Sequence, residues 1–197
     1  MARGPEEEAD EFRVPYRCLV PADVTELFKK GADEPGHSAW ADVVDEGDAE
    51  GDEEEADVQS AVSGLALSAC TIEDAPALSD RIVRIAGSAE EQQQACQEVL
   101  QHLRHAQGAE DGEAALFVVL VPSSAAGAIV GIRGQRVQEI SHRSGAKIEV
   151  SREILHGLDV QPVTLTGDLE QVIRGTAGIH EVLQELVSRG RLRPSDF

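Results

Sequence analysis

The sequence predicts an α/β (α+β) protein built from two similar units, each with the element order β-α-α-β-β-α. Two matches between the halves of the chain lead to this prediction. Residues 16–21 and 117–122 both contain an aromatic residue followed three places later by Leu-Val-Pro. Residues 83–87 and 163–167 both alternate aliphatic side chains and end in glycine, and each precedes a capped amphipathic helix. A repeat at this spacing indicates two copies of one supersecondary unit.

The first unit is predicted over 14–106. A short helix over 23–30 is expected because Val24, Leu27 and Phe28 fall on one face at helical spacing. Ser88 and Glu91 form a capping-box pattern before the last helix. The expected elements are strands at 14–21, 65–71 and 81–86 and helices at 23–30, 58–63 and 90–105.

An acidic insertion over about 31–57 interrupts the first unit. Residues 33–57 contain twelve Asp or Glu residues and no Lys or Arg. Such a block of like charges is expected to form a solvated, mobile loop. The N-terminal residues 1–13 are also polar and acidic, and we expect them to be disordered.

The second unit is predicted over 114–190, after a linker at 107–113 and before a basic tail at 191–197. Asp168 and Gln171 have the spacing of a capping box at the start of the last helix. Gly175 and Gly178 weaken that helix, so we expect a close packing contact there. The expected elements are strands at 115–121, 146–151 and 162–166 and helices at 123–130, 135–143 and 168–188.

A Gly-x-x-Gly turn, residues 131–134, lies between the two short helices of the second unit. Glycine permits positive φ angles and lets a ligand approach the main chain closely. A helix that begins at residue 135 would point its unpaired N–H groups and its dipole at an anion in this turn. Arg133 adds a cation at the tip. The turn is therefore suited to hold a phosphodiester backbone, whereas the first unit has no second glycine at the corresponding place, Gly31 to Glu34.

Residues 116–150 closely resemble a type I KH domain of the tandem kind found in poly(C)-binding and Nova-like proteins. The resemblance rests on Leu-Val-Pro at 120–122, Ile-Val-Gly-x-x-Gly at 129–134, Ile140, and Ser-Gly-Ala-Lys-Ile at 144–148. It implies a three-stranded antiparallel sheet packed on three helices in each unit, with the first copy divergent. The family usually has a basic residue directly after the first loop glycine, where this chain has Ile132.

The resemblance implies that the second unit binds single-stranded RNA, or single-stranded DNA, with about four nucleotides in an apolar groove. From this we expect a role in the post-transcriptional regulation of mRNA. Lining aliphatic residues, loop residues and flanking cations make up the implied contact set: Ile129, Gly131, Ile132, Arg133, Gly134, Arg136, Val137, Lys147, Ile148 and Arg152. Ile140 is expected in the core instead.

Other interpretations remain open at this stage. The turn at 131–134 could be an ordinary connection between helices, and the acidic first half could make the chain a scaffold that binds basic proteins. A dinucleotide-binding enzyme is disfavoured because Gly127, Gly131 and Gly134 lack the G-x-G-x-x-G spacing. No catalytic constellation is apparent, so we expect no enzyme activity, no cofactor and no metal.

Composition sets limits on the setting in which the protein works. The net charge of −20 argues against nucleic acid as a partner for the whole chain. Between residues 131 and 152, however, five basic residues face only Glu139 and Glu149. Three widely spaced cysteines, no secretory signal and no long apolar run favour the nucleus or cytoplasm, with no membrane contact. Cys18 and Cys96 are expected in the core, and His142, His156 and His180 on the surface.

Overall fold

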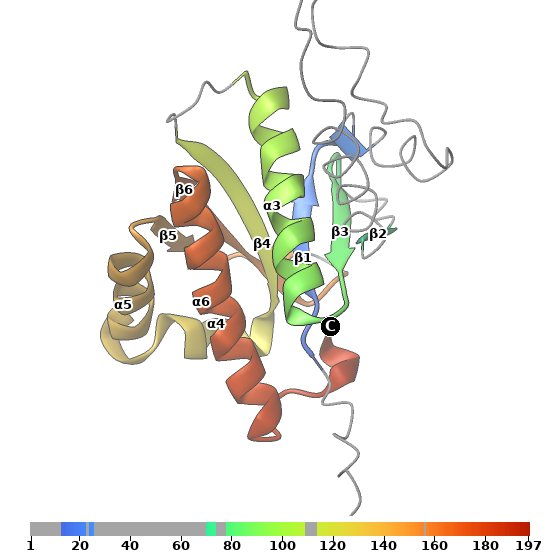
Figure 1. Cartoon of the computed structure of the whole chain (residues 1–197). Helices are drawn as coiled ribbons and strands as arrows, with labels where there is room; N and C mark the ends of the chain where they lie inside the picture. The colour runs from blue at the N-terminus through green and yellow to red at the C-terminus, as the bar shows by residue number, and fades with distance from the viewer. Residues whose placement is uncertain (1–12, 23, 26–69, 74–77, 109–113, 156) are drawn as a thin grey trace, which may run out of the picture.

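The protein is described from a computed structural model. The structure describes residues 13–22, 24–25, 70–73, 78–108, 114–155 and 157–197 (Figure 1). The predicted acidic insertion, the predicted helix at 58–63 and the N-terminal segment 1–12 lie outside these residues. Every helix in the described part of the chain is too short or too polar to span a bilayer.

A single antiparallel sheet of six strands forms the centre of the molecule, and the helices lie on one of its faces (Figure 1). The strand order is β2-β3-β1-β4-β6-β5. The strands are β1 (Tyr16–Val20), β2 (Cys70–Glu73), β3 (Arg81–Ile85), β4 (Ala115–Pro122), β5 (Lys147–Val150) and β6 (Val160–Gly167). The helices on the covered face are α3 (Ala89–Ala106), α4 (Ser123–Val130), α5 (Gln135–Ser144) and α6 (Leu169–Ser188).

The second half of the chain has the predicted element order. Helices α4, α5 and α6 and strands β4 and β6 begin and end within two residues of the predicted bounds, and β5 is one residue shorter at each end. Asp168 caps α6 through a reciprocal pair of hydrogen bonds with Gln171, as the capping-box pattern predicts. The strand order β4-β6-β5 and the three helices make this half a β-α-α-β-β-α unit.

Most of the described elements of the first half lie where they were predicted. Strands β1 and β3 and helix α3 lie at the predicted places, and Ser88 and Glu91 form the predicted capping box. Strand β2 covers Cys70–Glu73, whereas the prediction was 65–71, of which 65–69 lie outside the described residues. Of the helix predicted at 23–30, only Val24 and Thr25 are described, and both are helical.

One feature of the sheet was not predicted from the sequence: the two halves share it. Strand β1 pairs with β3 on one side and with β4 on the other, where Cys18 faces Val119 and Leu19 faces Val118. The expected pair of three-stranded sheets is therefore joined edge to edge. Strands β1 and β4 would each be an edge strand if the two sheets were separate. Because they pair with each other, two sites of unwanted strand association are removed.

The core is shared in the same way. One cluster of buried side chains contains residues of β1, β3 and α3 together with residues of β4, β6 and α6. Phe117 from β4 and Leu100 from α3 both belong to it, at 2% and 0% exposure. Cys18 and Cys96 are also buried there as expected, and burial raises the pKa of both thiols, that of Cys96 to about 12.

The main chain at Val14 is held by side chains from both halves. Its N–H donates to Gln184 Oε1 at 3.0 Å, and its carbonyl accepts from Gln92 Nε2 at 3.0 Å. The same carbonyl is bonded to Nε2 of His180. These bonds satisfy polar groups that would otherwise be costly to bury, and they connect the start of β1 to α3 and α6.

His180 corrects a prediction. It was expected on the surface, but it is 8% exposed and lies against the ring of Tyr16 with a centroid distance of 4.2 Å. Burial lowers the pKa of its imidazole, which the hydrogen bond to the Val14 carbonyl partly opposes. Sequence patterns do not indicate this burial, because the hydrogen bond between His180 and Val14 joins residues that are 166 positions apart. His142 is exposed as expected, and His156 lies outside the described residues.

Two further features concern the end of the chain. The glycines of α6 do mark close packing: a Cβ at Gly175 would lie 2.7 Å from Leu165, and a Cβ at Gly178 would lie 2.7 Å from Ile140. The residues after α6, expected as a basic tail, turn back so that Leu192 is 4% exposed within the shared core.

The shared core predicts that the two halves unfold together. Replacing Leu100 by Ala should lower the free energy of unfolding by about 2–5 kcal/mol, because it removes a buried side chain and leaves a cavity. Strand β4 should lose its structure in the same transition as α3. Urea unfolding followed by circular dichroism and by hydrogen exchange of β4 amides measures both effects, with Gln97→Ala on the exposed side of α3 as the control. Two separate transitions, with β4 unaffected by the substitution, would contradict a shared core.

Candidate nucleic-acid interface

The turn predicted to hold a phosphate backbone joins α4 to α5. Helix α4 ends at Val130, a short 3₁₀ turn covers Ile132–Gly134, and α5 begins at Gln135. Three of its four residues have positive φ angles: 72° at Gly131, 54° at Arg133 and 81° at Gly134. The chain therefore turns sharply within four residues, and α5 begins without a side-chain cap at its N-terminus. The N–H of Gln135 donates to the Ile132 carbonyl, and no side chain caps the N–H groups that follow it in the first turn of α5.

The two glycines are required for different reasons. A Cβ at Gly131 would lie 2.6 Å from the Cβ of Arg136 and 3.0 Å from its backbone nitrogen, so the position is crowded as well as left-handed. A Cβ at Gly134 would have Gln138 Nε2 as its nearest neighbour, at 3.9 Å, so only its φ angle favours glycine. Gly131 is thus the residue that lets the turn lie directly against the first turn of α5.

The two residues between the glycines project into solvent. Ile132 is 80% exposed, an unusual position for a large aliphatic side chain. Arg133 is exposed and takes a left-handed conformation that costs a non-glycine residue roughly 1–2 kcal/mol. Within the described residues its guanidinium forms no hydrogen bond or ion pair. Strain of this kind is often found where a residue is held ready for a ligand.

Arg136 lies beside the turn but already has a partner. Its guanidinium is hydrogen-bonded and ion-paired to the carboxylate of Glu185 on α6. The hydrogen bond from Arg136 lowers the pKa of Glu185, and the positive charges of Arg136 and Arg189 add to this effect. At neutral pH this carboxylate is therefore ionised and offsets part of the charge of Arg136.

The other predicted contact residues are divided between the surface and the interior. Val137 on α5 and Ile148 on β5 are half-buried, so each presents part of an aliphatic surface. Lys147 is exposed but paired with Glu149 at 2.9 Å. Arg152 is exposed and has no hydrogen bond or ion pair among the residues that the structure describes.

Ile129 is the predicted contact residue that the structure buries completely. It was expected to line the base-binding groove, but its side chain is 0% exposed and belongs to the core. It lies on the face of α4 that packs against the sheet, so it offers no surface to a base in this structure. Ile140, which was expected in the core, is 6% exposed and confirms that expectation.

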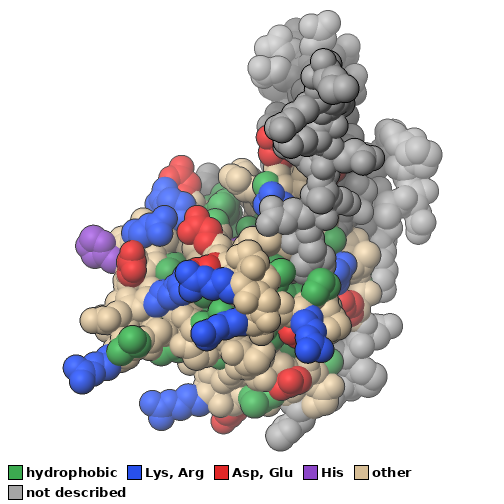
Figure 2. Space-filling view, turned by 90° about the horizontal axis from the view of Figure 1, so that it is seen from below, with side chains coloured by type: hydrophobic (Ala, Val, Ile, Leu, Met, Phe, Trp, Pro, Cys, Tyr) green, Lys and Arg blue, Asp and Glu red, His purple; other side chains and the backbone are tan. Residues whose placement is uncertain are grey.

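Figure 2 shows the end of the molecule that is lowest in Figure 1, where Lys and Arg side chains stand out from the surface with Asp and Glu side chains between them. In the second half, four exposed cations, Arg143, Lys147, Arg174 and Arg189, are each paired with a carboxylate, as in Arg174 with Glu170 at 3.1 Å. Arg133 and Arg152 differ from these because neither has a carboxylate partner among the described residues. Both are therefore available to an added anion, as is Arg191 after α6, which is also exposed.

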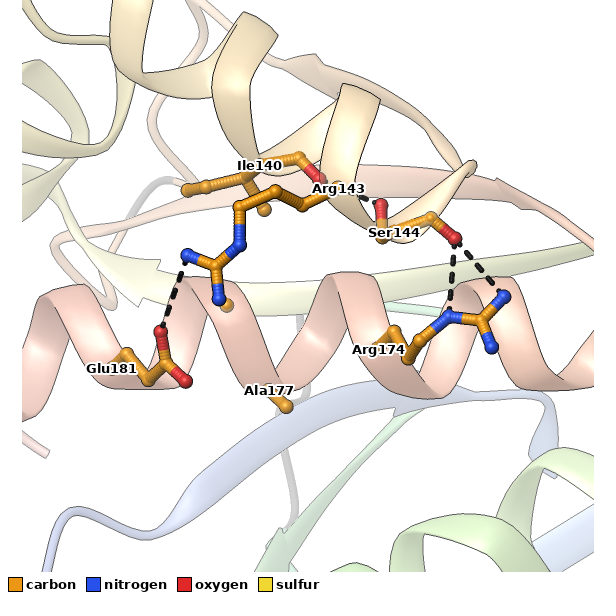
Figure 3. A pocket seen from close by; sticks show the side chains of 7 residues that line it. Ile140, Arg143, Ser144, Arg174, Ala177 and Glu181 are labelled. Atoms are coloured by element: carbon orange, nitrogen blue, oxygen red, sulfur yellow. Dashed lines mark hydrogen bonds and ion pairs between the residues drawn. The ribbon is translucent and has the colours of Figure 1, made fainter.

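A small pocket lies elsewhere, between α5 and α6 (Figure 3). It has a volume of about 190 Å³, and Arg143 and Arg174 stand on either side of Ala177. Arg143 points to Glu181 at 3.9 Å, and Arg174 donates to the Ser144 carbonyl at 3.3 Å. Sequence reasoning named none of its lining residues as contacts. No group of three His, Cys, Asp or Glu side chains in the described residues is arranged to hold a metal ion.

A comparison with protein-family models matches residues 116–181 to the KH domain. Residues 116–181 are a KH domain. The match begins in β4 and ends within α6, so it includes the turn at 131–134 and every predicted contact residue. The KH domain is a non-catalytic module that binds single-stranded nucleic acid, with the Gly-x-x-Gly loop clamping about four backbone nucleotides.

The two glycines of the loop differ in how much room a side chain would have, and this difference can be tested by substitution. Gly131→Ala should destabilise the domain by more than Gly134→Ala, because the added methyl group meets Arg136 as well as requiring a positive φ. We expect about 1–2 kcal/mol for Gly134→Ala, the cost of a left-handed non-glycine residue, and a larger loss for Gly131→Ala. Denaturant unfolding measures both. Equal losses would show that the crowding at Gly131 is relieved without cost.

Proposed function

We propose that this KH domain binds single-stranded RNA, or single-stranded DNA, by holding its phosphate backbone in the loop Gly131–Gly134. The observation that supports this most strongly is the loop itself: a left-handed, exposed Arg133 without a partner among the described residues, beside an uncapped helix N-terminus. A phosphate placed there would accept hydrogen bonds from main-chain N–H groups and gain from the dipole of α5.

Aliphatic contacts would have to hold the bases. Within residues 116–181 the only Phe, Tyr or Trp is Phe117, which is 2% exposed and unavailable for stacking. Ile132, Val137 and Ile148 offer exposed or half-buried aliphatic surface instead. Base identity would then be read by hydrogen bonds in the groove. Because stacking on aromatic rings contributes about 1–3 kcal/mol per base where it occurs, we expect moderate affinity with a strong dependence on salt.

In this proposal the first half of the chain is a divergent KH-like unit. It supports the KH domain and binds no nucleic acid itself. Its strand order β1-β3-β2 repeats the order β4-β6-β5 of the second half, and both are followed by a capped helix. Its sequence has no second glycine at 31–34 and twelve acidic residues over 33–57, which would repel a phosphate backbone. We propose that the whole protein acts in the post-transcriptional regulation of mRNA.

Charge reversal in the loop tests the proposal. In the full-length chain, Asp at both Ile132 and Arg133 should reduce binding to single-stranded RNA at least a hundredfold, because two anions would face the phosphates. The fold should persist since both side chains are exposed. Fluorescence anisotropy with a labelled random-sequence RNA measures affinity, and circular dichroism checks the fold.

A neutral variant separates charge from shape. Ile132→Ser with Arg133→Asn keeps residues that tolerate this turn, since Asn readily adopts a left-handed conformation. We expect intermediate binding and a weaker salt dependence from it. Unchanged affinity in a folded charge-reversed variant would refute the loop as the binding site.

A further inference from the structure

We propose that Arg136 and Arg189 form a second phosphate-binding site beside the KH loop, and that the carboxylate of Glu185 occupies this site when no nucleic acid is bound. The inference rests on the proposed function and extends it, since it assigns a second contact along the same strand and a residue that limits affinity.

The geometry of Glu185 resembles that of an anion held between two guanidinium groups. Its Oε2 is bonded to Nη2 of Arg136, and its Oε1 lies 2.7 Å from Nη2 of Arg189. Each carboxylate oxygen therefore has its own arginine. A phosphodiester also offers two negative oxygens to planar guanidinium groups, and arginine is well suited to hold it in this way.

The site adjoins the loop through Arg136. The crowded contact of this residue with Gly131 places the base of its side chain directly against the loop. Arg189 follows α6, so the site bridges the start of α5 and the end of α6. A strand that leaves the loop in the direction of Arg136 would bring a neighbouring phosphate to this pair of arginines.

The three side chains are accessible, which makes exchange feasible. Their exposed fractions are 37% for Arg136, 30% for Glu185 and 66% for Arg189, so water and a ligand can reach all of them. The cluster has two positive charges and one negative charge. A phosphate that replaces Glu185 must first separate this ion pair, so Glu185 acts as an internal competitor and lowers the affinity for the strand.

The comparable pair between Arg143 and Glu181 supplies a matched control. It also joins α5 to α6, but it lies at the pocket of Figure 3, between the C-terminal turn of α5 and the middle of α6. Glu181→Gln and Glu185→Gln change the net charge of the chain equally. A general reduction of negative charge would affect both variants alike, whereas release of a phosphate site beside the loop would affect only Glu185→Gln.

The test compares the full-length wild type and both variants for binding to a labelled random-sequence RNA of about eight nucleotides, twice the four that the loop clamps. Affinities are measured over a salt series. We expect Glu185→Gln to bind about three- to tenfold more tightly than Glu181→Gln at low salt. Its plot of log affinity against log salt should steepen by about 0.7 for each additional phosphate contact. Arg189→Gln should weaken binding and flatten this slope.

Two results would overturn the inference. Equal affinities and slopes for the two glutamate variants would show that no phosphate reaches the cluster. Weaker binding by Glu185→Gln would show that Glu185 serves to hold the loop in shape. The charge-reversed loop variant distinguishes this failure from failure of the proposed function: if that variant also binds RNA as the wild type does, the loop itself is not the site.

Discussion

The four-residue turn between α4 and α5 is the constraint on which the interface depends. Positive φ angles at Gly131, Arg133 and Gly134 turn the chain sharply between the two helices. As a result, the N-terminus of α5 is free of a side-chain cap while Ile132 and Arg133 project into solvent. The strain of holding Arg133 in this conformation has to be offset by the packing of the helices on either side. The turn can keep its shape only if α4 and α5 are firmly held.

The rest of the fold supplies that support. Helix α5 lies close to α6 because Gly178 leaves room for Ile140, and α6 lies close to the sheet because Gly175 leaves room for Leu165. The sheet in turn extends through β1 into the first half of the chain, which shares its core. The first half of the chain thus contributes to the rigidity of the second half, which carries the loop Gly131–Gly134. Rigid support of this kind lowers the entropy cost of binding a flexible strand.

The sequence predicted local structure well and long-range contacts poorly. Capping boxes at Ser88 and Asp168, the glycines of the turn and the alternation of β3 and β6 are local patterns, and the structure confirms the elements that they predicted. The pairing of β1 with β4 left no such pattern, because both strands are apolar and either could have been an edge. The burial of His180 and the ion pair of Arg136 with Glu185 depend on residues 166 and 49 positions apart. Spacing along the chain cannot reveal such contacts.

The contact residues illustrate the same limit. Ile129 and Ile132 are three positions apart and chemically identical, yet one is 0% exposed and the other 80%. The difference arises because Ile129 lies on the inner face of α4, whereas Ile132 lies beyond the helix end, where the chain turns outward. A family pattern names positions, but the backbone at those positions decides which side chains a ligand can reach.

Mapping of amide chemical shifts would locate the surface of the KH domain that contacts RNA. The full-length chain, labelled with ¹⁵N, is titrated with a random-sequence single-stranded RNA. We expect the largest shifts at Ile132, Arg133 and Gly134 and in the first turn of α5, with smaller shifts along β5 and none in α3. Shifts confined to α3 or to the pocket between α5 and α6, with the loop amides unchanged, would contradict the proposed function.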